Sequence, residues 1–222
     1  MAAAAADAYF GARFSLYPMT GRFVPVILDA LQALPEQGLE VETDDVSTFL
    51  GGHPDTVFGA LEGAFARAAA SGEHVVMSVL LSRGCPGEEV CDPGAAGPAP
   101  AAPQAPPGGG PAGPAVRVAC QWSLYPLGVP GYMDVIYREI KRTKESGVFT
   151  RGQHFVSRLD GELSAVLQAV RRSFDAAGDA AGHVVAHVTL SANSPTARRV
   201  GDAGGAGGAG GAGGAGGAGT PR

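Results

Sequence analysis

The chain has 222 residues and a formal net charge of -5, with 16 basic and 21 acidic side chains. An acidic chain with no basic cluster longer than a pair lacks the positive surface that phosphate backbones require, which excludes nucleic acid as a partner. No apolar run approaches the roughly 18 residues of a membrane span, and no basic segment precedes the N-terminal alanines, so a cytoplasmic protein without a signal peptide is expected. The cysteines Cys85, Cys91 and Cys120 form an odd set without C-x-x-C spacing, which predicts reduced thiols.

The first part of the chain predicts a β-α-β-β-α-β order. Phe14 and Leu16 alternate with Ser15 and Tyr17, as on a strand, and Pro18 ends this strand. Apolar residues three and four apart indicate two helices, and short β-rich stretches around a pair of aspartates indicate a hairpin. The predicted segments are a strand over about 9–17, a helix over 22–34, strands over 39–43 and 46–50, a helix that begins near residue 54 and carries Val57, Leu61, Phe65 and Ala68, and a strand over 73–82.

The second part of the chain repeats the first. Residues 45–86 align with residues 154–195 at a constant offset of 109, with 13 identities in 42 pairs, and the Ser-Leu-Tyr-Pro motif of residues 15–18 returns at 123–126. A repeat of this length indicates two folded units, which should pack together because units so small bury little surface alone. The second set of predicted segments is a strand over about 118–125, a helix from Tyr132 through Ile140 that ends at 145–147, strands over 148–150 and 155–159, a helix with Val166, Val170, Phe174 and Ala177, and a strand over 183–191.

We therefore predict an α+β protein of two tandem ferredoxin-like subdomains with antiparallel sheets. A stretch of proline, glycine and alanine separates the copies, and a glycine-glycine-alanine repeat follows Asp202. Such segments bury too little apolar surface to offset their ordering entropy, so both are expected to be disordered. The predicted boundaries are 8–87 for the first subdomain, 88–116 for the linker, 117–196 for the second subdomain and 197–222 for the tail.

Polar residues recur at corresponding positions of the two copies and predict two related ligand pockets. The first set is Ser15, Tyr17, Asp45 and Thr48, and the second set is Ser123, Tyr125, His154 and Ser157. A hydroxyl beside an aromatic ring suits a flat heteroaromatic ligand, although a strand tyrosine before a proline also serves simply to cover a sheet edge. The chain contains no nucleophile elbow, P-loop or dinucleotide-binding glycine motif, which weakens any case for an enzyme.

The third strand sets the expected difference between the pockets. Asp45 aligns with His154, and a carboxylate favours a cationic ligand whereas a neutral histidine offers one donor and one acceptor. Strict alternation sends Asp45 and Thr48 to opposite faces, so both reach one site only if the end of the hairpin bends. If it does not, Asp44 takes the place of Asp45.

Histidines offer an alternative reading. His74 and His183 begin the last strand of each copy, where a histidine commonly caps the preceding turn. His183 and His187 share a strand face and, with His154, could form a metal site. A small metal-dependent enzyme on a ferredoxin-like scaffold is therefore one alternative, and an ACT-like regulatory module that binds an amino acid is another.

Several spaced motifs together resemble the YkoF-type thiamine and hydroxymethylpyrimidine-binding proteins, over nearly all of both copies. These motifs are residues 14–19, 43–48, 84–87, 123–126, 147–149 and 190–195. The resemblance implies tandem ferredoxin-like (ACT-like) subdomains, a homodimer, and one pyrimidine pocket per subdomain that binds its ligand without a cofactor or catalysis. It also implies a link to the salvage of thiamine precursors through a membrane transporter. The chain departs from the family pattern in its linker, in its tail, and at Asp45, where a histidine is expected.

Overall fold

The computed structural model describes residues 10–35, 37–85 and 115–197. Each copy forms a β-α-β-β-α-β unit, as predicted. The first unit contains β1 (Phe10–Pro18), α1 (Phe23–Leu31), β2 (Leu39–Thr43), β3 (Thr48–Gly52), α2 (Pro54–Ala69) and β4 (Val75–Arg83). The second unit contains β5 (Arg117–Leu127), α3 (Tyr132–Lys144), β6 (Phe149–Gln153), β7 (Val156–Glu162), α4 (Leu163–Gly178) and β8 (His183–Ala192). Most of the expected linker and nearly all of the expected tail lie outside the described residues.

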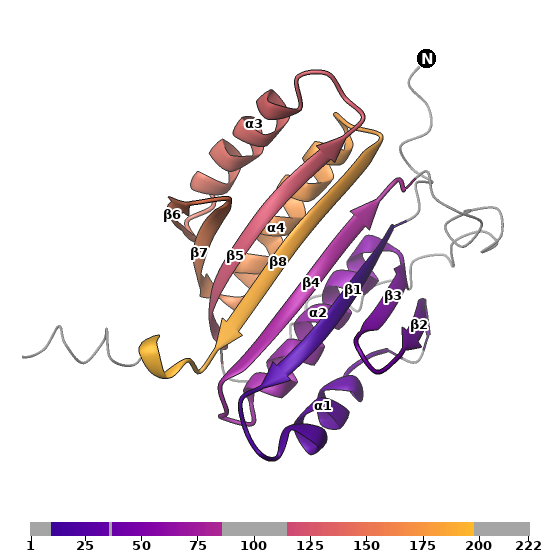
Figure 1. Ribbon diagram of the computed structural model, residues 1–222, viewed down its shortest axis with the longest axis vertical. Coiled ribbons are helices and arrows are strands. Elements are labelled where there is room, and N and C mark those ends of the chain that lie inside the picture. Colours follow the sequence, from indigo (N-terminus) through magenta and orange to yellow (C-terminus); the bar gives the residue numbers. More distant parts are fainter. Residues whose placement is uncertain (1–9, 36, 86–114, 198–222) are drawn as a thin grey trace, which may run out of the picture.

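The two units share one antiparallel sheet. Its eight described strands run in the order β2-β3-β1-β4-β8-β5-β7-β6, so that the last strands of the two copies, β4 and β8, pair at its centre (Figure 1). The two sheets predicted from the sequence are therefore joined by backbone hydrogen bonds along the β4–β8 pair, which we call the seam. The residues of the seam pair from Val75 with Ala192 to Arg83 with Val184.

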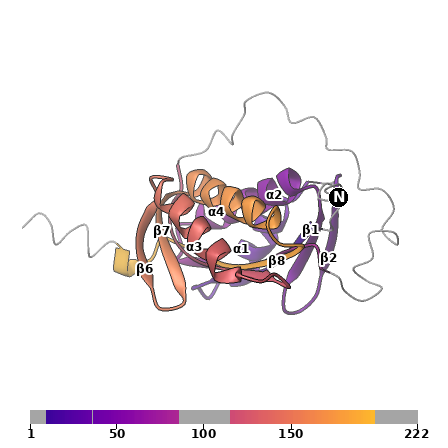
Figure 2. The same ribbon diagram turned by 90° about the horizontal axis from the view of Figure 1, so that it is seen from above.

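The helices cover one face of this sheet (Figure 2). Alternate residues of β1, including Phe14 and Leu16, are buried beneath them, and so are Trp122 and Leu124 of β5. The predicted helix stripes are also buried: Val57, Leu61, Phe65 and Ala68 on α2, and Val166, Val170, Phe174 and Ala177 on α4. Burial of a side chain such as Phe65 contributes about 2 to 3 kcal/mol. The opposite face of the sheet, which we call the helix-free face, is covered by none of the described helices.

The helices of the two units also meet. Arg171 of α4 reaches Asp55 at the start of α2, with 3.0 Å between Nη1 and Oδ1, and its guanidinium lies 5.1 Å from the ring centroid of Phe58. Phe10 of β1 stacks on Phe58 and contacts the edge of Phe174 from the other unit. The two units therefore share a continuous core, as the small size of each unit predicted. None of the described helices is long and apolar enough to cross a membrane.

Most element boundaries shift by one to three residues from the predicted ones, and the shift of β3 matters for the site. The sequence predicted a strand over 46–50, whereas β3 begins at Thr48. The reason is a turn after Thr43, in which Oδ1 of Asp44 accepts hydrogen bonds from the backbone N–H groups of Val46 and Ser47, both at 2.8 Å. These bonds satisfy backbone groups outside the strand ladder.

Candidate ligand-binding site

Four of the predicted site residues lie on the helix-free face: Ser15 and Tyr17 on β1, and Ser123 and Tyr125 on β5. They point away from the helices because their neighbours along each strand are buried beneath the helices. Tyr17 is 49% exposed and Tyr125 is 46% exposed, so both rings are available to a ligand. Each tyrosine lies opposite a valine of the last strand of its own copy, so the two rings have equivalent cross-strand neighbours.

The turn between β2 and β3 lies against Ser15 of the first set. The hydroxyl of Ser15 donates a 2.9 Å hydrogen bond to the carbonyl oxygen of Val46, and Nη1 of Arg13 donates to Asp44 at 3.2 Å and to Ser47 at 3.0 Å. Hydrogen bonds from the backbone N–H groups of Ser47 and Val46, with a smaller contribution from Arg13, lower the pKa of Asp44. The turn thus holds a charged carboxylate beside Ser15.

Asp45 and His154 occupy the exposed tips of the two hairpins. Within the described part of the chain, the carboxylate of Asp45 forms no hydrogen bond or ion pair. Asp44 is therefore the carboxylate next to Ser15, which is the arrangement expected if the hairpin end does not bring Asp45 into the site. His154 lies beside Phe155, which is 94% exposed and has a φ of 69°, a backbone conformation that is unfavourable for a large side chain.

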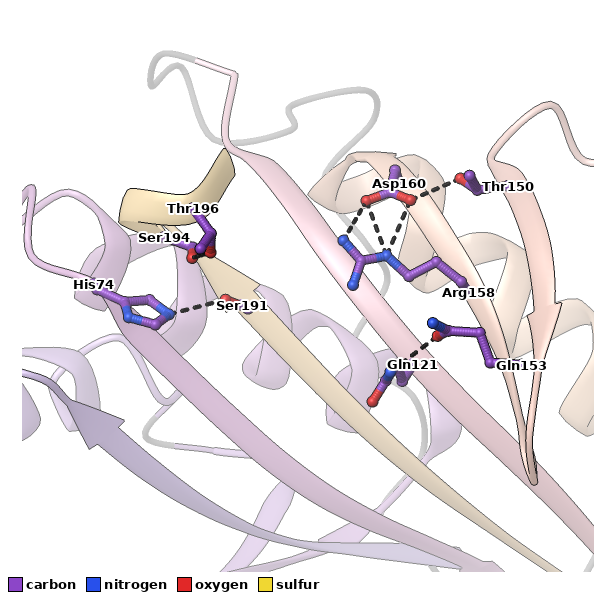
Figure 3. A network of polar contacts seen from close by, with 9 residues as sticks. All are labelled: His74, Gln121, Thr150, Gln153, Arg158, Asp160, Ser191, Ser194 and Thr196. Carbon is purple, nitrogen blue, oxygen red and sulfur yellow. Dashed lines mark hydrogen bonds and ion pairs between the residues drawn. The ribbon is translucent and has the colours of Figure 1, made fainter. Parts of the chain in front are cut away.

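The second copy carries a more polar network on the helix-free face (Figure 3). Gln121 on β5 donates a 3.0 Å hydrogen bond to Gln153 at the end of β6. Arg158 on β7 donates hydrogen bonds of 2.7 to 3.1 Å to both carboxylate oxygens of Asp160, and Thr150 donates a further bond at 2.7 Å. Burial alone would raise the pKa of Asp160, but the bonds from Arg158 and Thr150 outweigh it and the pKa is lowered. A row of polar groups held by hydrogen bonds therefore begins next to Ser123, at Gln121, and extends along the helix-free face away from Tyr125.

Thr48 and Ser157 lie on the other side of the sheet. Thr48 pairs with Phe14 and Ser157 pairs with Trp122 in the strand ladders, so both hydroxyls are buried on the helix-covered face. The hydroxyls of Thr48 and Thr43 are 3.0 Å apart and hydrogen-bonded, which ties β3 to β2. The eight predicted residues thus divide into four on the helix-free face, two at hairpin tips and two beneath the helices.

The histidines of the last strands join the two copies instead of capping turns. On the helix-free side of the seam, three histidines form side-chain hydrogen bonds with serines of the opposite strand: His74 with Ser191 at 3.1 Å, His187 with Ser78 at 3.1 Å and His183 with Ser82 at 3.4 Å.

These bonds also bear on the proposed metal site. His183 and His187 share a face, as predicted, but each is bonded to a different serine, and His154 lies at the tip of the β6–β7 hairpin. In the described ranges, no group of three or more histidine, cysteine, aspartate or glutamate side chains is placed to hold a metal ion.

Sequence reasoning missed several polar residues of the helix-free face. Arg13 and Gln121 each stand two positions before the selected serine, and strand alternation was a sufficient signal to include them. Arg158 and Asp160 alternate in the same way along β7. Only their mutual hydrogen bonds, which depend on side-chain geometry, distinguish them from ordinary exposed charges.

The duplicated fold agrees with comparisons to known proteins. The family model described as the YKOF-related family matches residues 9–88 and 117–197, one match for each unit. The chain therefore belongs to this family. A protein of Bacillus subtilis (strain 168), provisionally named HMP/thiamine-binding protein YkoF, is 36% identical over 200 residues, which cover 85% of this chain and 92% of that protein.

Proposed function

We infer that this protein binds thiamine or its hydroxymethylpyrimidine moiety, without transforming it, at one pocket in each subdomain. The observation that carries this proposal is the equivalent placement of Ser15 with Tyr17 and of Ser123 with Tyr125 on the helix-free face, where both rings are about half exposed. Membership of the YKOF-related family, and the name of the Bacillus subtilis relative, support the choice of ligand.

The chemistry of these residues suits an aminopyrimidine. A flat heteroaromatic ring can stack on an exposed tyrosine, and a neighbouring serine hydroxyl can accept a hydrogen bond from its amino group. A pocket that hydrogen-bonds particular ring groups rejects analogues that lack them, because its own polar groups are then left unpaired. The proposed pockets therefore select a substituted pyrimidine and not aromatic compounds in general.

The two pockets are proposed to differ in charge. Asp45 stands at the tip of the hairpin that lies against the first pocket, and its charge, added to that of Asp44, favours the thiazolium charge of thiamine, whereas His154 at the tip of the second hairpin offers one donor and one acceptor. Thr48 and Ser157, which lie beneath the helices, are proposed to support the third strand of each copy, as the bond between Thr48 and Thr43 does.

The proposal includes assembly as a homodimer and a functional link to a membrane transporter in the salvage of thiamine precursors. Exposed apolar side chains support the association of two chains. Leu80 is 48% exposed at the centre of the helix-free face, and Phe155 is almost completely exposed at a hairpin tip.

Calorimetric titration with thiamine, and separately with hydroxymethylpyrimidine, tests the function and the site together. We expect two binding events per chain, with Tyr17→Ala weakening one and Tyr125→Ala weakening the other by roughly tenfold, because each removes a stacking surface. Tyr137→Ala is the matched control, since Tyr137 is an exposed tyrosine on α3, away from the helix-free face.

Absence of heat from the wild-type protein with both ligands would contradict the proposed function. Binding that neither tyrosine substitution changes would leave the function standing and contradict the site.

A further inference from the structure

A cleft of about 760 Å³ lies between α2 and α4, on the helix-covered side of the sheet. Its volume falls in the range of small-molecule sites. Its apolar walls are mainly alanine and glycine of α2, together with the two residues that precede β5. The polar side chains that line the cleft are Glu62, Arg67, Arg117, Glu162, Ser164 and Asn193.

Because the chain is duplicated, the residues that line this cleft have counterparts in the other half of the α2–α4 interface. At the offset of 109, Arg171 is the counterpart of Glu62, and Asp55 is the counterpart of Ser164. Arg171 and Asp55 form the 3.0 Å ion pair that joins the two helices, and the guanidinium of Arg171 also lies over Phe58. One half of the interface therefore contains an arginine–aspartate ion pair. The other half has a glutamate and a serine at these two positions, beside the cleft.

The charged side chains that line the cleft carry a net negative charge, because Glu62 and Glu162 outnumber the one arginine that remains after Arg67 is paired with Asp29. Arg67 donates two hydrogen bonds to Asp29, at 2.8 and 2.9 Å, and is neutralised there. Arg117 is the cross-strand neighbour of Glu162. Within the ranges 10–35, 37–85 and 115–197, Glu62 forms no ion pair, and its pKa is raised by burial and then by the charge of Glu162. A negative charge held in this way is unfavourable until a cation compensates it.

We propose that this cleft binds a small organic cation, an ammonium or guanidinium compound with one positive charge, between Glu62 and Glu162. A guanidinium in this position compensates the charge of Glu62, and the small alanine side chains leave room for its hydrocarbon part. The site lies on the opposite face of the sheet from Tyr17 and Tyr125, so it is independent of the proposed pyrimidine pockets.

The test is a titration of the full chain with propylguanidinium chloride, followed by NMR of the alanine methyl groups. We expect saturable shifts of the methyl signals of Ala66 and Ala70, which line the cleft. Propylurea, a neutral compound of nearly the same shape, should give none. Glu62→Gln should weaken binding of propylguanidinium by roughly tenfold, the loss expected for one partly buried charge pair. Glu62→Arg combined with Ser164→Asp, which recreates the pair of Arg171 and Asp55, should abolish binding.

Three results would overturn the proposal: no saturable shift in the wild-type chain, equal binding of propylurea, or undiminished binding to the Glu62→Gln variant. A fourth concerns the chain's own Arg198 and Arg199, which follow the described residues. If propylguanidinium binds only after both are replaced by alanine, the cleft holds the C-terminal segment and is not a ligand site. Glu62→Gln keeps the side-chain shape, so the test does not depend on the folding of the double variant.

Discussion

Gly84 after β4 and Asn193 after β8 hold the same position in the two copies, and both adopt a left-handed backbone, with φ of 72° and 57°. Asn193 donates side-chain hydrogen bonds to the carbonyl oxygens of Ala69 at 2.8 Å and of Glu73 at 3.0 Å. At Gly84 a side chain has no room, because a Cβ would collide with the carbonyl oxygen of Gly182. The two ends of the seam are thus closed differently, by a side chain at one end and by close backbone contact at the other.

This contact predicts that Gly84→Ala is strongly destabilising. We expect a loss of at least about 2 kcal/mol in the free energy of unfolding, from the left-handed backbone and the collision together. Gly128→Ala is the control, because Gly128 has a φ of 70° but a Cβ added there would meet none of the described residues within 4 Å. It should lose only about 1 kcal/mol. Urea denaturation measures both, and equal losses would contradict the proposed collision.

The histidine–serine bonds predict a measurable contribution to the seam. His74→Ala and His183→Ala should each lower the free energy of unfolding by about 1 kcal/mol, because each leaves a partly buried serine without its partner. His154→Ala, at the exposed hairpin tip, should change it by less than about 0.5 kcal/mol. If all three variants unfold at the same urea concentration as the wild type, these bonds do not stabilise the seam.

Cys120 should be inert while the protein is folded. It is 1% exposed on β5, and burial raises the pKa of its thiol to about 12, so the reactive thiolate is almost absent at pH 8. Iodoacetamide should therefore modify Cys120 only in denaturant, whereas the partly exposed Cys85 should react in the native protein. Mass spectrometry of peptides after timed labelling measures both, and rapid native labelling of Cys120 would show that β5 opens.

Asp45→His should convert the first proposed pocket into one that resembles the second. Loss of the carboxylate should weaken thiamine binding at this pocket by several-fold and leave hydroxymethylpyrimidine binding nearly unchanged, because only thiamine carries the thiazolium charge. Asp45→Asn separates charge from shape and should behave in the same way. Calorimetry with both ligands is the measurement, and a parallel loss for both would argue that Asp45 contacts the pyrimidine.

Glu62 should make stability depend on pH. Its pKa is raised above the ordinary value of 4.5, so the folded state holds the proton more tightly than the unfolded state does. The wild type should therefore lose stability as the pH rises from the ordinary pKa through the raised pKa. Glu62→Gln should match the wild type near pH 4 and exceed it at pH 7 by roughly 0.5 kcal/mol, a small gain because solvent screens a partly exposed group.

Urea denaturation at the two pH values measures this difference. Glu145→Gln, at the exposed end of α3, is the control for the loss of one surface carboxylate. A difference between Glu62→Gln and the wild type that is the same at both pH values would contradict the raised pKa.

The sequence alone determined the number of units, their β-α-β-β-α-β order and the face on which Ser15 and Tyr17 lie. These features follow from local periodicity, which occurs in both copies of the repeat. Side chains alternate between the two faces of a strand whichever strands lie beside it. The buried stripes of α2 and α4 follow from the same kind of pattern, because apolar residues spaced by three and four positions must share one side of a helix.

Tertiary structure decided which strands pair and which side chains meet. The pairing of β4 with β8 joins residues more than 100 positions apart, and nothing in the local pattern of either strand distinguishes the other copy as its partner. Because of the turn held by Asp44, β3 begins at Thr48. The register of β3 with β1 pairs Thr48 with Phe14 and places its hydroxyl beneath the helices, on the opposite face from Tyr17. Side-chain periodicity is a property of single strands and helices, whereas register and contact depend on the packing free energy of the whole chain.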